Sequence, residues 1–310
     1  MASGPLAPVS FITDPQFQPV TIVVGAYSVA WYLRGVRRVA RRGQPWAPAR
    51  TVAFVAGVIV IFVSATSGLA AFATSNFTAA GFLYLSLGLV GPGLVVLGAP
   101  LRLAEMASVS PAKPSTAPAE PSTAPGEPST RSSRIDSLLA NRAVRAVSFP
   151  VVTWVIYTGS VLALFFTGLF GEFLANLWVR QALTVVLVAV GLGFWWVVAG
   201  VDRSPWRLGY WQRILYLMLT FPVFGILGMT LQSERSRISP DISLASLHLG
   251  AAVLWVAGET VALSATISVF AQWLRNDEKA AQNHDRDSEA AAARQLALWR
   301  ASRDAAARAN

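Results

Sequence analysis

The carboxyl group of Glu259 is the side chain best placed for chemistry, because it lies deep in a long apolar segment. An ionisable group inside a bilayer is costly and marks a functional site or a specific partner. Glu259 suits a proton relay, a cation ligand or the counter-charge for another helix. It equally suits a hydrogen-bonded carboxyl that bridges two helices, and the sequence alone leaves these readings open.

Two further ionisable residues lie in or beside apolar segments. Arg180 is predicted to lie inside a membrane helix, where it is a candidate partner of Glu259, and Glu172 is its rival for that pairing. Asp202 follows the same apolar segment and is predicted to be a surface charge beside neighbouring arginines. These residues widen the search for a site beyond Glu259.

Residues for catalysis or metal binding are scarce. The chain has no cysteine, which excludes disulfides and thiolate metal sites, and it has only two histidines, His248 and His284. Met218 and Met229 are spaced to share a helix face, which favours core packing over a copper path. No nucleophile triad, phosphate loop or H-E-x-x-H pattern occurs. We therefore predict a protein that is not an enzyme and has no evident cofactor, with copper possible although its ligands are not apparent.

The elements that carry these side chains are predicted to be transmembrane helices. Seven apolar segments are long enough, or nearly so, to cross about 30 Å of hydrocarbon. They cover residues 20–33, 51–72, 77–101, 149–169, 174–200, 208–231 and 244–274. Only helices satisfy all backbone hydrogen bonds in lipid without closing a barrel. The predicted fold class is an all-α, polytopic membrane protein with seven transmembrane helices.

The basic residues predict the orientation of these helices. Of the 25 lysines and arginines, 22 fall in alternate gaps and the tail, whereas the other gaps hold only Arg235 and Arg237. The positive-inside rule then places the N-terminus outside and the C-terminus in the cytoplasm. The net charge of +9 is explained by this topology and by attraction to anionic lipids. Nucleic acid is not an expected partner, because the cations lack interleaved aromatics for base stacking.

Four regions are predicted along the chain. They are a three-span bundle at 1–105, a Pro/Ser/Thr-rich cytoplasmic linker at 106–134, an amphipathic helix with a four-span bundle at 135–275, and a charged helical tail at 276–310. The linker repeats a seven-residue unit from Pro114, which favours an extended, solvated tether. Pro92 and Pro222 lie deep in apolar segments and are predicted to kink those helices.

Several short motifs resemble those of the bacterial cytochrome c oxidase assembly factor CtaG, in the same order and on the same seven segments. They are residues 14–15 (DP), 34–43 (RGVRRVARRG), 67–71 (SGLAA), 96–100 (VLGAP), 194–205 (FWWVVAGVDRSP), 255–259 (WVAGE) and 272–277 (QWLRND). The resemblance spans both bundles outside the linker and the distal tail. It implies a role in building haem–copper oxidase.

The resemblance fails where the family carries histidines that are thought to handle copper. Those positions align with Ala80, Tyr84, Arg180, Val186 and Phe224. A family aspartate before the tryptophan motif aligns with Ser246, and His248 matches none of these positions. The copper function is therefore not carried over residue by residue. Only Glu259, with Trp255 and Gly258, matches the family cleanly.

The expected function is a membrane-embedded assembly or accessory factor for cytochrome c oxidase in a bacterial plasma membrane. It would act by holding an oxidase subunit or another assembly factor. The candidate functional residues are Glu259, Trp255, Gly258, Arg180, Asp202 and Pro222. Two alternatives remain open, a copper-binding factor with unrecognised ligands and a small-molecule or ion permease that uses Glu259 and Arg180.

Overall fold

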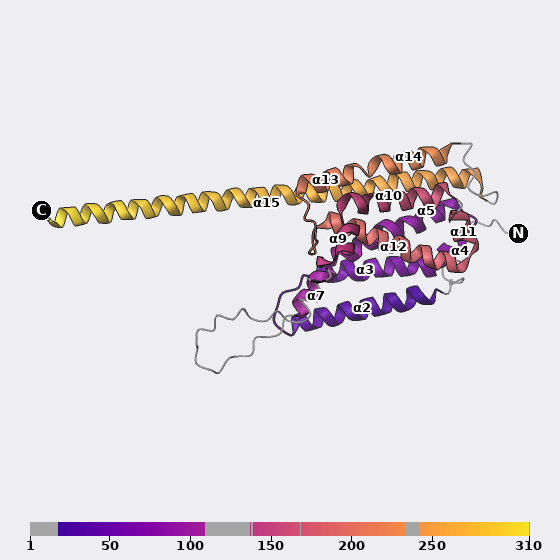
Figure 1. The fold of residues 1–310 in the computed structure, drawn as a ribbon, viewed down its shortest axis with the longest axis horizontal. Coiled ribbons are helices and arrows are strands. Elements are labelled where there is room, and N and C mark those ends of the chain that lie inside the picture. Colours follow the sequence, from indigo (N-terminus) through magenta and orange to yellow (C-terminus); the bar gives the residue numbers. More distant parts are fainter. Residues whose placement is uncertain (1–17, 109–136, 138, 168, 234–241, 310) are drawn as a thin grey trace.

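The described part of the protein is a bundle of helices with one long helix projecting from it (Figure 1). The computed structural model describes residues 18–108, 137, 139–167, 169–233 and 242–309. No strand occurs among these residues, which confirms the all-α prediction for this part of the chain. Asp14, Pro15 and the proline repeat from Pro114 lie outside the described residues.

The first three apolar segments each form one or more helices. Their bounds are α2 (Pro19–Ala40), α3 (Pro48–Thr66), α4 (Gly68–Phe72), α5 (Phe77–Leu85), the π-helical turn η1 (Ser86–Val90), α6 (Gly91–Leu97) and α7 (Pro100–Ser108). Proline opens α2, α3 and α7, at a position where its missing N–H would have no intrahelical partner. Helix α5, the turn η1 and helix α6 follow one another without a gap, and Gly98 and Ala99 separate α6 from α7.

The second half of the described chain is also helical. Its elements are α9 (Arg142–Val147), α10 (Pro150–Phe166), α11 (Leu169–Ala175), α12 (Leu177–Ala199), α13 (Tyr210–Met218), α14 (Phe221–Gln232) and α15 (Leu244–Ala309). By length and composition, five helical elements can cross a membrane: Pro48–Thr66, Phe77–Ser108, Leu177–Ala199, Tyr210–Gln232 and Leu244–Ala297. Helix α10 is apolar but has 17 residues. Crossing by α2 and α10, and hence seven spans, stays a prediction.

Both predicted proline kinks coincide with breaks in helical geometry. Just before Pro92, the Gly91 N–H donates to the Ser86 carbonyl five residues back, which is the π-helical pattern. Pro222 lies in the first turn of α14, after the chain leaves α13 at Leu219 and Thr220. In each case, the ring removes one backbone donor and the helix adjusts locally.

The π-helical turn lies directly against α12. A Cβ atom on Gly191 would lie 2.3 Å from the Gly88 carbonyl oxygen, so only glycine permits this approach. The indole N–H of Trp195 donates to the Leu89 carbonyl at 2.8 Å. Backbone contact and one buried hydrogen bond thus join α12 to the broken third segment.

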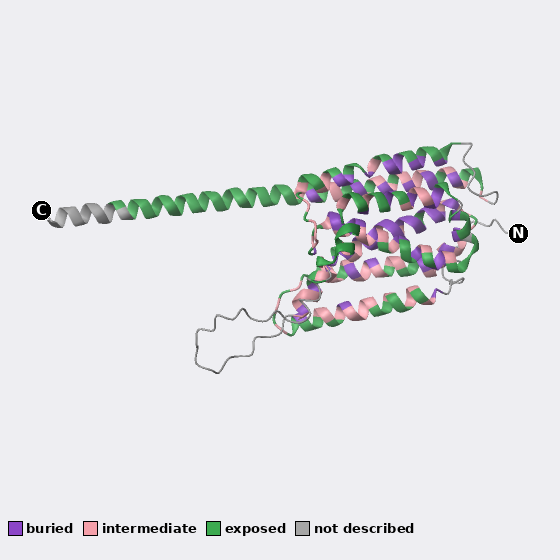
Figure 2. Cartoon of the chain, in the orientation of Figure 1, coloured by how far each residue is buried: buried purple, intermediate pink, exposed green. Residues whose placement is uncertain are grey.

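Two predicted boundaries differ from the structure. The segment predicted as one amphipathic helix over 135–147 is interrupted at Asn141: residues 137, 139 and 140 are helical, and α9 begins after Asn141, whose extended ψ of 129° lets its side chain cap the Ala143 N–H. The predicted tail is not a separate element, since α15 continues through it for 66 residues, or about 100 Å. From residue 276 to residue 297, this helix is exposed (Figure 2).

The predicted orientation can be tested with single cysteines, because the chain has none of its own. Ser236→Cys is expected to react with a membrane-impermeant maleimide in intact cells, whereas Ser122→Cys reacts only after permeabilisation. The reason is that the cation count places position 236 outside and position 122 in the cytoplasm. The opposite labelling pattern would overturn the orientation.

Candidate functional site

The carboxylate of Asp202 is buried, with 8% of the residue exposed, and it is not the surface charge that the sequence predicted. Its Oδ1 accepts the N–H of Arg102 at 2.8 Å and its Oδ2 accepts the N–H of Leu101 at 3.2 Å. These two N–H groups belong to the first turn of α7 and have no intrahelical acceptor. Asp202 therefore caps α7 from a distant part of the chain, where the helix dipole also favours a negative charge.

Local backbone geometry turns α7 toward Asp202. Ala99 adopts a left-handed φ of 51° between α6 and α7. The hydroxyl of Tyr32 on α2 donates to the Gly98 carbonyl at 2.8 Å, which holds the end of α6. The motif at 96–100 and the motif at 194–205 therefore meet in space, although about 100 residues separate them.

Burial raises the pKa of Asp202 above its ordinary value of 3.8, and the two backbone N–H donors oppose this effect. The folded state therefore binds the Asp202 proton more readily than the unfolded chain does. The proton-linked part of its contribution to stability is therefore greatest at acid pH and is lost as the pH rises through the raised pKa, separately from the hydrogen bonds that cap α7.

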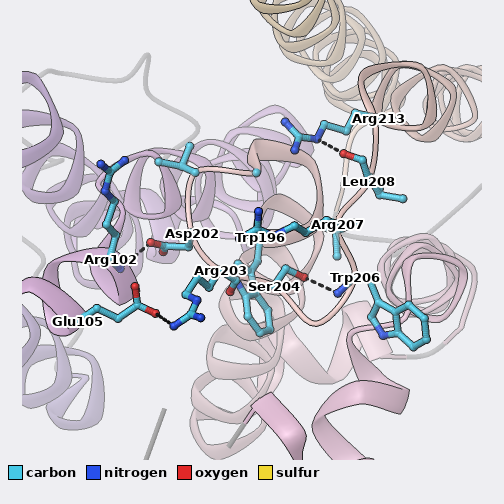
Figure 3. Close-up of a pocket in the computed structure, with 13 residues that line it drawn as sticks. Arg102, Glu105, Trp196, Asp202, Arg203, Ser204, Trp206, Arg207, Leu208 and Arg213 are labelled. Carbon is cyan, nitrogen blue, oxygen red and sulfur yellow. Dashed lines mark hydrogen bonds and ion pairs between the residues drawn. The ribbon is translucent and has the colours of Figure 1, made fainter. Parts of the chain in front are cut away.

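The connection after Asp202 is held by two arginines. Arg203 forms an ion pair with Glu105 of α7 at 3.3 Å. Arg213 of α13 places its guanidinium over Gly200, where a Cβ atom would lie 2.1 to 2.4 Å from it, and Gly200 has a left-handed φ of 56°. The Nε of Arg213 also donates to the Leu208 carbonyl at 3.1 Å. These contacts enclose a cavity of about 360 Å³ (Figure 3).

A second cluster lies between α14 and α15 and contains the three residues that match the family pattern. The Trp255 indole N–H donates to Oε1 of Glu259 at 2.6 Å. Both side chains lie against Gly225 of α14, where an added Cβ would lie 3.7 Å from the carboxylate and 3.8 Å from the indole nitrogen. An added Cβ on Gly258 would lie 2.8 Å from the Phe224 ring. Trp255, Gly258 and Glu259 thus share one interface, near the point where Pro222 opens α14.

Arg180 is separate from this cluster. It is buried near the start of α12, and its Nε donates to the Phe173 carbonyl at 3.1 Å. Helices α12 and α15 start at the same end of the bundle (Figure 1). At 1.5 Å per residue, Arg180 lies about 5 Å and Glu259 about 23 Å from those starts. The permease alternative needs these two residues together, and the structure does not bring them together.

Three of the positions aligned with the family histidines are buried in the core. Ala80 and Tyr84 are buried in the core, and Phe224 packs on Gly258. Val186 is exposed on the outer face of α12. Ser246 joins two helices, because its hydroxyl accepts the Phe77 N–H at 2.8 Å at the start of α5.

The sulfur and imidazole groups do not converge within the described chain. Met218 and Met229 are 39% and 62% exposed, so the prediction that they fill the core was wrong. The Nε2 atom of His248 is buried without a described hydrogen-bond partner, whereas His284 is exposed on α15. No group of three or more His, Asp or Glu side chains among the described residues can hold a metal ion.

Comparison with known proteins assigns the chain to a family. The sequence model for the family described as cytochrome c oxidase caa3 assembly factor (Caa3_CtaG) matches residues 30–276. The chain belongs to this family. The Caa3_CtaG match includes both clusters described above, and it ends where α15 leaves the bundle.

Relatives of this Caa3_CtaG chain occur in mycobacteria. An uncharacterised protein of Mycobacterium leprae is 28% identical over 83% of this chain and 39% of its own length. Uncharacterised proteins of Mycobacterium bovis and Mycobacterium tuberculosis are each 27% identical over 90% of this chain and 42% of their own length. This chain therefore spans about two fifths of the length of these relatives. No solved structure matches it.

Proposed function

We propose that this Caa3_CtaG protein is a membrane-embedded accessory factor that supports cytochrome c oxidase assembly through protein contacts and not through copper coordination. The family match over residues 30–276 carries the oxidase role. The expected location is a bacterial plasma membrane, which the five membrane-length apolar helices and the mycobacterial relatives support.

The non-copper part of the proposal rests on side-chain chemistry. Copper sites in proteins use imidazole, thioether or thiolate ligands that converge on the ion. Here the two methionines of the second bundle face outward, and the aligned histidine positions hold alanine, tyrosine, valine, arginine and phenylalanine. The family-matched cluster at Glu259 is instead a hydrogen-bonded pair within α15 that packs against α14.

A protein that works by contact needs a rigid body and a free surface. Rigidity is supported by the Asp202 cap on α7, by the Trp195 bond to the third segment and by the packing of the hydrogen-bonded Trp255–Glu259 pair of α15 on α14. The described surface of α15 beyond the bundle is exposed (Figure 2). This charged helix offers a surface for an oxidase subunit or a second assembly factor.

Gentle purification of the tagged protein from its native membrane tests this proposal. We expect oxidase subunits or another assembly factor to copurify, at levels well above those obtained with an unrelated tagged membrane protein. We also expect copper in the same sample to be far below one ion per chain. Stoichiometric, tightly held copper would contradict the non-copper mechanism, and a preparation free of oxidase-related proteins would contradict the contact mechanism.

A further inference from the structure

The cavity beside Asp202 is strongly basic. Its lining includes four arginines, Arg102, Arg203, Arg207 and Arg213. They come from α7, from the connection between α12 and α13, and from α13 itself, and Figure 3 shows them around one space. The cavity volume of about 360 Å³ falls within the range of about 300–1,000 Å³ that is typical of small-ligand sites.

The two carboxylates of the cavity already have partners. Asp202 accepts two backbone N–H groups of α7, and Glu105 pairs with Arg203. The Arg102 and Arg207 side chains are exposed. Within the described chain, neither guanidinium makes a side-chain hydrogen bond or an ion pair. The positive charge of the cavity is therefore only partly balanced by the protein.

Arg213 is held in place before any ligand arrives. Its Nε bond to the Leu208 carbonyl and its position over Gly200 fix the guanidinium beside the cavity. A Cβ atom at position 200 would occupy the place of this guanidinium. A fixed, planar guanidinium is well suited to bind phosphate oxygens through paired hydrogen bonds.

Tryptophans place the cavity at the depth of lipid headgroups. Trp196 and Trp206 line it, and their indole N–H groups donate to the carbonyls of Arg203 and Arg145 at 3.2 and 2.8 Å. Trp211, at the start of α13, is 76% exposed. Tryptophan gathers at membrane–water interfaces, where its ring is in the apolar boundary and its N–H finds a polar partner. The cavity thus opens where headgroup phosphates are abundant.

We propose that this arginine cavity binds the phosphate of an anionic phospholipid headgroup, with Arg102 and Arg207 contacting the phosphate and Arg213 completing the site. Membrane topology requires cations near helix ends, but it does not require three chain segments to direct them into one cavity. The four arginines outnumber the two carboxyl groups of the cavity, and a bound anion relieves the repulsion among the guanidinium groups. Basic pockets at the membrane surface bind anionic headgroups in this way. This site goes beyond the oxidase role and does not depend on it.

The test uses the purified full chain, stripped of lipid in a neutral detergent. Phosphatidylglycerol, phosphatidylcholine and inorganic phosphate are each titrated, and bound lipid and the thermal midpoint are measured. Phosphatidylglycerol is expected to bind and to raise the midpoint, because it carries a net negative phosphate. Phosphatidylcholine and inorganic phosphate are expected to do neither at matched concentrations.

Two double variants distinguish binding at the cavity from general attraction of the lipid to surface charge. Arg102→Gln with Arg207→Gln is expected to weaken phosphatidylglycerol binding about tenfold or more, since two charge-assisted contacts are lost. The matched control, Arg37→Gln with Arg41→Gln, removes the same charge from the exposed end of α2, outside the cavity. This control is expected to bind like the unmodified protein.

The outcomes are distinct. If the unmodified protein binds phosphatidylcholine as well as phosphatidylglycerol, the proposal is overturned whatever the variants do. It is also overturned if the cavity variant and the control variant lose the same amount of phosphatidylglycerol binding. If inorganic phosphate raises the thermal midpoint and phosphatidylglycerol does not, the cavity binds phosphate but the proposal that a lipid supplies it is overturned. Oxidase content in the cavity variant is a separate readout, so a normal oxidase level there leaves the lipid result standing.

Discussion

Replacing Asp202 by alanine is expected to destabilise the protein by about 3 kcal/mol, because two hydrogen bonds to its carboxyl oxygens are lost and their backbone donors in the first turn of α7 are left without an acceptor. The affected donors are the Leu101 and Arg102 N–H groups. The loss of the cap also loosens α7 from the end of α12. The measurement is the thermal midpoint of the purified protein in detergent at neutral pH.

Asp202→Asn is the matched variant, since its amide oxygen can still accept from Arg102 but its NH₂ group cannot accept from Leu101. We expect it to lose about half as much stability as the alanine variant. Asp277→Ala on exposed α15 is a control for charge loss and is expected to have no effect. Equal midpoints for the Asp202→Ala variant and the unmodified protein would show that the cap does not matter.

Replacing Glu259 by leucine is expected to destabilise the α14–α15 interface by about 1–3 kcal/mol, because the Trp255 indole N–H loses its acceptor. We also expect lower accumulation of the protein and less assembled oxidase, since this cluster matches the family pattern. The measurements are the amount of protein in the membrane, its thermal midpoint and the oxidase content of the cells.

Glu259→Gln distinguishes hydrogen bonding from charge. The amide oxygen still accepts from Trp255, so a structural role predicts nearly normal stability and oxidase content. If the glutamine variant is stable but oxidase content falls, the carboxylate itself has a chemical role. If the leucine variant is normal in every measurement, Glu259 has neither a structural nor a functional role.

The helices could be predicted because an apolar segment of sufficient length indicates a helix that is able to cross a membrane. The seven segments coincide with helices, and Pro92 and Pro222 mark breaks. The continuity of α15 was missed because its composition changes sharply at 276, although no helix-breaking residue stands there. A change from apolar to charged residues changes the surroundings that the helix prefers, but it does not end the helix.

The candidate site was predicted only in part. The family resemblance singled out Trp255 and Glu259, which are one helical turn apart, but the pairing of Asp202 with α7 joins distant segments and leaves no periodic pattern. A signal was nevertheless present. The helix that opens at Pro100 is preceded by Gly98 and Ala99, which have no capping oxygen, so its N–H groups needed a remote acceptor. The pairing of Arg180 with Glu259 was not predicted correctly, because the sequence does not show how far each residue lies along the bundle.

The most direct test of the central claim is the content of assembled haem–copper oxidase in cells that lack this gene. Reduced-minus-oxidised spectra of washed membranes, with oxygen consumption as support, measure that content. We predict a clear loss of the oxidase signal that the intact gene restores, and that extra copper in the medium does not. An unchanged oxidase spectrum, in a strain without a second family member, would contradict a role in oxidase assembly.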